Sequence, residues 1–200
     1  MAATKPVRPR VDDVREVALT VFAERGYHGT TMSAIAQRVG VRVPTLYSHI
    51  RSKQDLLVDI AVETTEAVLA DYEAAVADVT DPAERLRRAV EVYALRHATH
   101  RREALVVNRD VSSLEEPARG EVFARIQRHE HAIRGIIADG VARGAFTTGT
   151  PAQTSFAILE MSVSIARWFQ EDGPLTAQAV ASEYADLALN MVRAPVPTIA

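Results

Sequence analysis

A cluster of hydroxyl, imidazole and basic side chains surrounds two helix-breaking residues, Gly40 and Pro44. Hydroxyl and imidazole groups bind DNA phosphates, and small residues at the tip of a helix can approach base edges in a groove. Lys53 opens the next helix, where free backbone amides also favour a phosphate. The pattern predicts a DNA-contacting surface made of the following residues: Thr31, Ser33, Arg42, Val43, Pro44, Thr45, Tyr47, Ser48, His49 and Lys53.

The spacing of Gly40 and Pro44 explains why a helical stretch contains two breakers. Ile35 and Leu46 belong to an apolar face, and Ala36 is the small residue that lets two helices cross closely. Glycine makes a left-handed turn inexpensive, and proline is tolerated in the first turn of the following helix. The two breakers therefore mark the turn of a helix-turn-helix, whose second helix spans about residues 43–50. A helix-turn-helix that serves only as a packing corner is the alternative.

The span from Val11 to Leu57 resembles the DNA-binding domain of tetracycline-repressor-family regulators. The matching pieces are VFAERGYHGTTMSAIAQRVGV and PTLYSHIRSKQDLL. The resemblance implies an all-helical homodimer whose C-terminal domain binds an effector. It also implies base contacts by Pro44 and Thr45. The positions that match phosphate-contacting residues of the family are Thr31, Tyr47, His49 and Lys53.

Two residues depart from the family pattern. Arg42 stands where a capping serine is common, so we expect the second helix to lack a side-chain cap. Val43 stands where some relatives carry glutamine, and valine packs on a thymine methyl but cannot make the bidentate adenine contact. The operator sequence therefore cannot be transferred from a relative.

The charge is distributed unevenly along the 200 residues, whose formal net charge is −3. Residues 1–53 hold nine basic and four acidic residues, whereas the remainder holds 14 basic and 22 acidic ones. A basic N-terminal part favours a polyanion partner for that part only. The chain has no cysteine, no signal peptide and no run of ~20 apolar residues that would span a bilayer. We therefore expect a cytoplasmic protein with no membrane association.

Capping signals divide the chain into about nine helices, and no segment shows strand alternation. Predicted N-terminal caps are Asp12, Ser52, Asp81 and Thr150, and predicted helix stops are Gly26, Gly144 and Gly173. The predicted fold is all-α. We expect a flexible basic arm over residues 1–10, a three-helix DNA-binding domain over 11–57, a helical effector-binding and dimerisation domain over 58–194, and a tail over 195–200.

Two histidines lie on apolar helix stripes in the C-terminal domain: His97 follows Tyr93, and His129 follows Ile126. Such a histidine is commonly a satisfied core residue, but in the resembled family the central helices surround the effector. The predicted effector site contains Tyr93, His97, Phe123, Ile126, His129, Met161 and Trp168. His97 with His100, and His129 with His131, have metal-ligand spacing without a matching carboxylate motif. We therefore predict no metal site, no cofactor and no catalytic residue.

The last two helices are predicted to form a two-fold four-helix interface over residues 151–193, because reading a palindrome requires a dimer. The alternative is a bundle within one chain. The predicted interface residues are Phe156, Val163, Val180, Tyr184, Leu187 and Met191. The ending WFQEDGPLTAQAVASEYADLAL is loosely similar to a family branch that regulates lipid and steroid breakdown, with some members answering to acyl-CoA esters.

The predicted function is that of a repressor released from a palindromic operator in double-stranded DNA by a small lipophilic effector, for which an acyl-CoA-type ester is one candidate. One alternative is a DNA-binding adaptor whose C-terminal domain only dimerises or recruits a protein. An apolar pocket of several hundred Å³ would favour the sensor over the adaptor (roughly the size range of ligand pockets). The other alternative, a helical-bundle metal enzyme, lacks the Glu-x-x-His pairs that such sites use.

Overall fold

The computed structural model describes residues 10–193, and over that range the chain forms nine α-helices, one 3₁₀ turn and no strand. The helices are α1 (Val11–Arg25), α2 (Met32–Val39), α3 (Val43–Tyr47), α4 (Lys53–Val76), α5 (Pro82–Thr99), α6 (Arg101–Asp110), α7 (Ala118–Ala142), α8 (Pro151–Trp168) and α9 (Ala177–Arg193), with the turn η1 (Val111–Ser113) after α6. The all-α expectation is confirmed. The expected tail over 195–200, and the expected arm apart from Arg10, lie outside the described residues.

Side-chain caps begin three of the helices, and those at Ser52 and Asp81 were expected from the sequence. The Thr31 hydroxyl accepts a hydrogen bond from the Ala34 amide at the start of α2. Ser52 does the same for α4, and Asp81 does so for α5, where Pro82 occupies the first helical position. Each cap satisfies an amide that would otherwise lack a partner, which typically contributes about 1 kcal/mol.

Other predicted boundaries are wrong. Asp12 lies inside α1, and the Arg10 amide donates to Asp13 just before the helix begins. Thr150 makes no side-chain cap bond to α8. Gly173 does not end a helix, because α8 stops at Trp168, where Phe169 turns to an extended conformation.

The short helix α3 and the break between α5 and α6 also differ from expectation. The helix α3 ends at Tyr47 and has only five residues. The break lies at His100, with φ −116° and ψ 51°. No proline or glycine precedes or occupies this break, so the sequence contains no breaker there.

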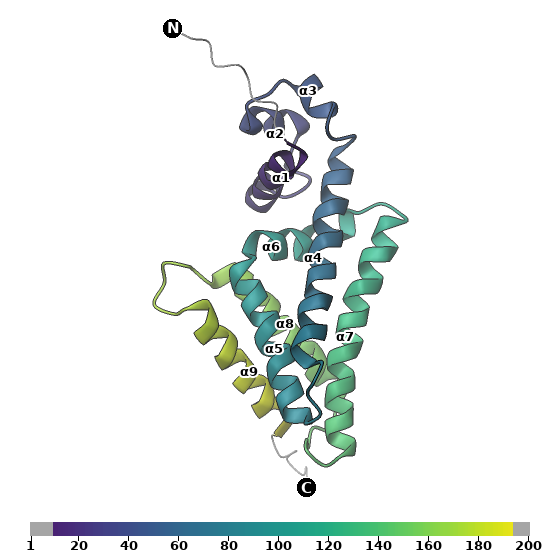
Figure 1. Ribbon diagram of the computed structural model, residues 1–200, viewed down its shortest axis with the longest axis vertical. Coiled ribbons are helices and arrows are strands. Elements are labelled where there is room, and N and C mark those ends of the chain that lie inside the picture. The colour runs from purple at the N-terminus through teal and green to yellow at the C-terminus, as the bar shows by residue number, and fades with distance from the viewer. Residues whose placement is uncertain (1–9, 194–200) are drawn as a thin grey trace.

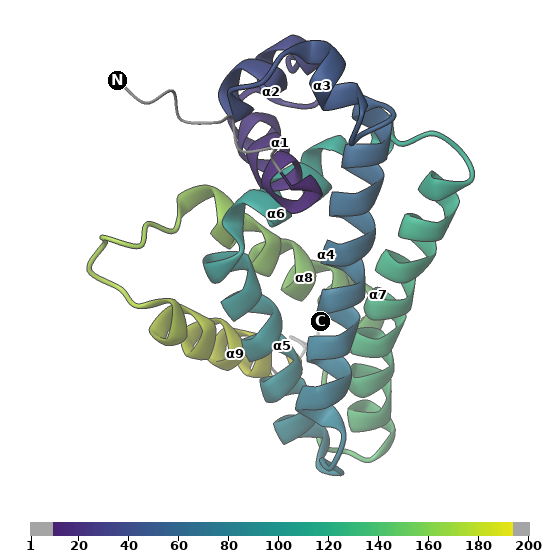
Figure 2. The ribbon, with the colours of Figure 1, turned by 45° about the horizontal axis from the view of Figure 1, so that its top comes forward.

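The helices α1, α2 and α3 form one end of the molecule, and α5, α7, α8 and α9 form the other (Figure 1). A single uninterrupted helix, α4, runs from the first group into the second, so the expected boundary at residues 57–58 falls inside a helix. Figures 1 and 2 place α6 beneath α1 and beside α4, where it contacts both.

Two large cores follow from this arrangement. The first joins Phe22, Ile35 and Leu46 of the N-terminal helices to Val106 and Val107 of α6. The second lies among α4, α5, α7, α8 and α9. Because the first core includes α6, a shift of α6 is transmitted directly to the packing of α1–α3. Within residues 10–193, none of the helices combines the length and the hydropathy of a bilayer-spanning segment.

Candidate functional site

The turn between α2 and α3 has the predicted geometry. Gly40 has φ +81°, a left-handed conformation that side chains other than glycine rarely adopt. The amides of Gly40 and Val41 both donate to the Ala36 carbonyl at 3.0 Å, which closes the end of α2. Leu46 is fully buried and fixes α3 against the first core. The five-residue helix is therefore held by packing, since helices this short are unstable alone.

The outward face of α3 is exposed. Pro44, Thr45, Tyr47 and Ser48 are exposed, and Tyr47 keeps 51 % of its surface accessible. A large aromatic side chain left this accessible on a polar face is available to a partner. The other predicted contact residues that are exposed are Thr31, Ser33 and Arg42, while Val43, His49 and Lys53 are half-buried.

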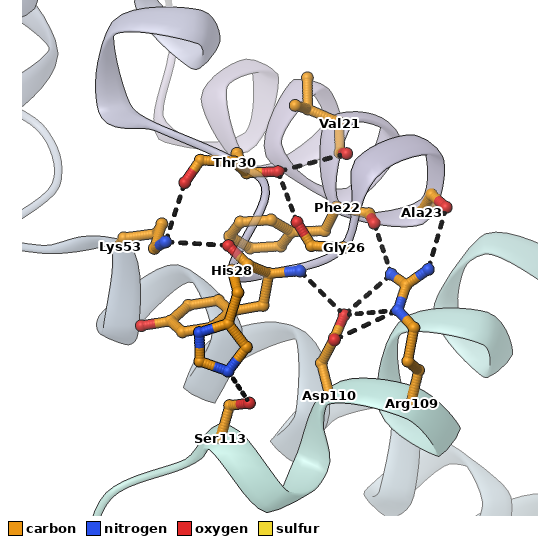
Figure 3. Close-up of polar contacts among 11 residues, drawn as sticks. Val21, Phe22, Ala23, Gly26, His28, Thr30, Lys53, Arg109, Asp110 and Ser113 are labelled. Carbon is orange, nitrogen blue, oxygen red and sulfur yellow. Dashed lines mark hydrogen bonds and ion pairs between the residues drawn. The ribbon is translucent and has the colours of Figure 1, made fainter.

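Two of these residues have structural partners that the sequence did not reveal. Val43 packs against the first core with part of its surface. Lys53 Nζ donates to the carbonyls of Tyr27 and Thr30, both at 2.8 Å, and lies 4.2 Å from the centre of the Tyr27 ring (Figure 3). The Lys53 side chain therefore fixes the loop between α1 and α2, and two of its three donors are already in use. Arg42 makes no cap bond, as expected.

A polar contact between α6 and the N-terminal helices was not predicted from the sequence. Arg109 donates to the carbonyls of Phe22 and Ala23, near the end of α1 (Figure 3). Its neighbour Asp110 is buried, pairs with Arg109 at 2.8 Å and accepts from the Tyr27 amide at 3.2 Å. Beyond it, His28 bonds to Ser113. These hydrogen bonds join side chains and backbone atoms that are more than 80 residues apart in the chain, so no periodic pattern in the sequence predicts them.

A cavity of about 130 Å³ lies among α4, α5, α6, α7 and α8. Its lining combines apolar, uncharged polar and charged side chains: Thr64, Thr65, Val68, Tyr93, Arg96, His97, His100, Ala104, Val107, Asn108, Arg125, Ile126, His129, Glu130, Leu159, Glu160 and Val163. Four of the predicted effector-site residues, Tyr93, His97, Ile126 and His129, meet here.

The two cavity histidines enclose the Tyr93 ring. Ring centres lie 4.4 Å apart between Tyr93 and His97, and 4.6 Å apart between Tyr93 and His129. Burial lowers the pKa of His97 to about 4, against a smaller opposing effect of its bond to the Tyr93 carbonyl. Burial, and then the neighbouring His97, lower the pKa of His129 to about 4. Burial raises the pKa of Tyr93, so all three rings are uncharged at neutral pH.

The hydrogen bonds of these rings are incomplete. His97 Nδ1 lies 2.9 Å from the Tyr93 carbonyl, which can only accept, so Nδ1 carries the hydrogen and Nε2 is an acceptor. His129 is 4 % exposed, and its Nε2 is buried without a hydrogen-bond partner among the described residues. A buried polar atom without a partner costs about 1–3 kcal/mol, and a bound ligand can supply the missing partner.

Three predicted effector-site residues do not line the cavity. Phe123 on α7 is 38 % exposed and is not part of the lining. Met161 packs against the second core. Trp168 is exposed and stacks on Tyr184, with ring centres 6.3 Å apart. Helical spacing located the correct helices, but the rotation of each helix placed these side chains on other faces.

The predicted interface residues also separate by exposure. Phe156 on α8 and Leu187 on α9 expose 62 % and 50 % of their surfaces. Val180 is 1 % exposed in an apolar cluster with Ile165 and Phe169, so its side chain is covered by its own chain. Val163 lines the cavity. Tyr184 and Met191 are half-buried against cores of their own chain.

No group of three or more histidine, aspartate or glutamate side chains in residues 10–193 is placed to hold a metal ion. His100 and His131 are both exposed, and only His100 lies at the cavity with His97 and His129.

Comparison with known proteins agrees with this architecture. Residues 79–192 match the family described as "Tetracyclin repressor-like, C-terminal domain", and residues 14–60 match "Bacterial regulatory proteins, tetR family". The chain is 26 % identical over 196 residues, 94 % of each chain, to the transcriptional repressor KstR2 of Mycolicibacterium smegmatis. The structure of the TetR-family regulator PfmR from Thermus thermophilus is similar, with a TM-score of 0.79 and 33 % identity over 88 % of this chain and 97 % of that one.

A further similar structure is that of AibR in complex with isovaleryl coenzyme A and operator DNA. The TM-score is 0.80 and the identity is 25 %, over 94 % of this chain and all of AibR. The family match extends over more than half of the chain and includes both the helix-turn-helix and the helical C-terminal part. The chain therefore belongs to the tetracycline-repressor family of bacterial transcriptional regulators, which bind DNA through a helix-turn-helix.

Proposed function

We propose that this regulator is a homodimeric repressor released from a palindromic operator by a small lipophilic effector bound in the cavity. The observation that carries the proposal is that one helix, α6, serves both regions. Its residues Ala104, Val107 and Asn108 line the cavity, and Arg109 and Asp110 at its end hold the N-terminal helices. A ligand that shifts α6 would therefore reposition the helix-turn-helix.

We assign the DNA contacts to the exposed face around the turn. Thr31, Tyr47 and His49 are the proposed phosphate ligands, supported by the exposure of Thr31 and Tyr47. Pro44 and Thr45, at the exposed tip of α3, are the proposed base contacts. Ser33, Ser48 and Arg42 flank them. Phosphate contacts position the protein, and only the base contacts select a sequence.

Selection of binding sites from random duplex DNA tests the DNA-binding half of the proposal. We expect a palindromic consensus, and an affinity that falls steeply and linearly on a log–log plot against salt concentration, because phosphate contacts release counterions. Mapping the consensus to the source genome would identify the regulated genes. A non-palindromic consensus would contradict the two-fold arrangement.

The adaptor alternative differs at the cavity. At about 130 Å³ the cavity is smaller than the several hundred Å³ that would favour a sensor by size alone, because Tyr93, His97 and His129 occupy much of the space between the helices. Its unpartnered His129 nitrogen supports a ligand site. An effector that lowers operator affinity in the wild type, but not in a His97→Phe variant that still binds DNA, would exclude the adaptor.

One of the similar structures contains a ligand that suggests a chemical class for the effector. AibR is seen in complex with isovaleryl coenzyme A, which makes a short acyl-CoA ester a candidate effector here. Titration of the operator complex with isovaleryl coenzyme A tests that candidate.

A further inference from the structure

The charges around the cavity bear on what kind of effector it accepts. An open acidic groove adjoins the cavity, and Thr64, Arg96 and His100 line both. Together the two linings contain seven carboxylates and three guanidinium groups, and three of the carboxylates, those of Asp12, Glu16 and Glu63, pair with Arg10, Arg102 and Arg15. The carboxylates belong to Asp12, Asp13, Glu16, Glu63, Glu103, Glu130 and Glu160, and the guanidinium groups to Arg15, Arg96 and Arg125.

None of the three guanidinium groups is unpaired. Arg15 pairs with Glu63, Arg96 with Asp71, and Arg125 with Glu66. By contrast, Glu103, Glu130 and Glu160 form no ion pair among the described residues. An anionic ligand would have to displace an existing ion pair or remain beside unpaired carboxylates. The field of the site therefore disfavours negative charge on the ligand.

The buried end of the cavity contains uncharged groups. His97 Nε2 is an acceptor because Nδ1 donates to the Tyr93 carbonyl, and His129 Nε2 is buried without a partner. With pKa values of about 4, only roughly one imidazole in a thousand is protonated at pH 7, so neither ring supplies a cation for a carboxylate. The buried, unpartnered His129 nitrogen indicates a ligand at this place, independently of the acidic groove. His97 lines the same cavity and packs on the same Tyr93 ring, and its Nε2 is the nitrogen whose acceptor role is fixed, so we assign the ligand's hydrogen bond to His97.

We propose that the cavity selects a small molecule that has no negative charge and donates a hydrogen bond to His97 Nε2 at its buried end. The proposal rests on the effector-binding function proposed above and narrows its chemical class to neutral or cationic hydroxyl, amide or amine compounds. Carboxylates and coenzyme A esters are then poor ligands, despite the ligand in the AibR complex.

Ring-sized probes suit the test, because the cavity of about 130 Å³ is close in size to an engineered apolar cavity of about 150 Å³ in another protein that binds benzene. Calorimetric titration of the full chain with toluene, phenol, benzylamine and benzoate at pH 7 separates shape, hydrogen bonding and charge. We expect benzylamine to bind at least tenfold more tightly than benzoate. Double replacement by Glu130→Gln and Glu160→Gln should narrow that ratio.

A His97→Phe variant tests the hydrogen bond while keeping an aromatic ring beside Tyr93. Phenol and toluene differ in hydration, so the ratio of their affinities is measured in both proteins. The informative quantity is the phenol-to-toluene ratio of the variant compared with that of the wild type. We expect that ratio to fall roughly tenfold, the effect of one buried hydrogen bond with its partner lost. His131→Phe, which replaces an exposed histidine on α7, is the matched control and should leave the ratio unchanged. Thermal melting confirms that each variant is folded.

Four outcomes overturn this inference: no probe binds, benzoate binds more tightly than benzylamine, the phenol-to-toluene ratio is unchanged in His97→Phe, or isovaleryl coenzyme A binds more tightly than every uncharged probe. Operator binding measured on the same samples separates the two proposals. Release of operator by isovaleryl coenzyme A would support the repressor and contradict the ligand class. Probes that bind as expected without affecting operator would support the ligand class and show that filling the cavity alone does not release DNA.

Discussion

The Lys53 ammonium group has two partners in the folded protein, which changes what its removal is expected to do. Lys53→Ala leaves the Tyr27 and Thr30 carbonyls without their donor, and we expect the free energy of unfolding to fall by about 1–3 kcal/mol. Tyr47→Phe removes an exposed hydroxyl and should change stability by less than about 0.5 kcal/mol. Chemical denaturation compares the two. Equal stabilities would show that the Lys53 bonds contribute nothing.

Both of those variants should also weaken binding to all DNA sequences about equally, because a phosphate contact carries no base preference. For Lys53 the phosphate role remains a prediction that must be separated from its structural one. Binding measured well below the melting temperature of each variant, with specific and random duplexes, makes that separation. A changed base preference in Tyr47→Phe would contradict its assignment to phosphate.

Val43 lies at the tip of α3 with one side against the core. We expect Val43→Gln to change base preference at one position in each half-site, symmetrically, with almost no change in salt dependence, because glutamine can bond adenine and valine cannot. The measurement is binding to operators in which each half-site base is varied at fixed salt. A uniform loss across all operators would show that the packing role of Val43 dominates.

The cavity histidines make stability depend on pH. Their folded pKa of about 4 lies below the unfolded value of 6.5. As the pH falls from 6.5 towards 4, the unfolded chain takes up protons that the folded chain does not, so stability is lost on acidification. Between pH 7 and pH 5 we expect each histidine to remove about 2 kcal/mol from the free energy of unfolding.

Denaturation of His129→Phe at both pH values tests this expectation against the wild type. The variant should lose less stability on acidification, while His131→Phe, exposed on the same helix, should behave as the wild type does. Parallel pH profiles for all three proteins would mean that His129 is not buried as a neutral ring.

At the scale of the helix, capping chemistry and turn residues located most elements from sequence. Ser52 and Asp81 marked helix starts that the structure confirms, because a side-chain oxygen three residues before a free amide is a local signal. The helix stop predicted at Gly173 is wrong, because the sequence does not distinguish a glycine in a loop from a glycine that ends a helix. The break at His100 was missed because no breaker residue precedes or occupies it.

The cavity residues could be predicted from the sequence only where the helical periodicity of apolar residues marks them. His97 and His129 were found because they continue apolar stripes, and both line the cavity. Phe123 is exposed, whereas Ile126, three residues later, is half-buried and lines the cavity, since a small rotation of α7 decides which position faces inward. Contacts such as Arg109 to the Phe22 carbonyl depend on the fold of both partners, so no sequence pattern reports them.

The contact between α6 and α1 gives a prediction for Asp110→Asn. The change keeps the shape of the side chain but weakens its pairing with Arg109, which holds the carbonyls of Phe22 and Ala23. We expect effector affinity to remain near wild type, while the effector-induced loss of operator affinity becomes smaller because the polar link between α6 and α1 is weaker. Effector-induced changes in affinity are typically about 5–150-fold, so a reduction is measurable. Operator titrations with and without effector measure it.

Glu116→Gln is the matched control for that experiment. It disrupts an exposed ion pair between Glu116, which precedes α7, and Arg119, in the first turn of α7, away from α1. Its coupling should equal that of the wild type. An Asp110→Asn protein that responds to effector as fully as the control would show that α6 communicates through its apolar contacts alone.

For the whole molecule, Phe156 of α8 and Leu187 of α9 are exposed, and we propose this surface as the docking site of a second copy. Leu187→Glu should weaken the proposed homodimer and lower operator affinity, since burying an unpaired charge at an interface is costly. Phe123→Glu replaces another exposed apolar residue, on α7, and should leave the oligomeric state unchanged. Sedimentation velocity measures both. Equal dissociation of the two variants, or of neither, would place the interface elsewhere.

The unbroken helix α4 has a mechanical consequence. Its 24 residues, each rising about 1.5 Å, make a rod about 36 Å long, with the helix-turn-helix at one end and the cavity residues Thr64 and Thr65 near its middle. Tilting a rod of that length by about 5° displaces its tip by roughly 3 Å, close to the spacing of about 3.4 Å between stacked bases. In the proposed release mechanism the helix would act as a lever arm, and a movement smaller than one side-chain diameter at the cavity would suffice to put the two recognition helices of the proposed dimer out of step with the grooves of the duplex.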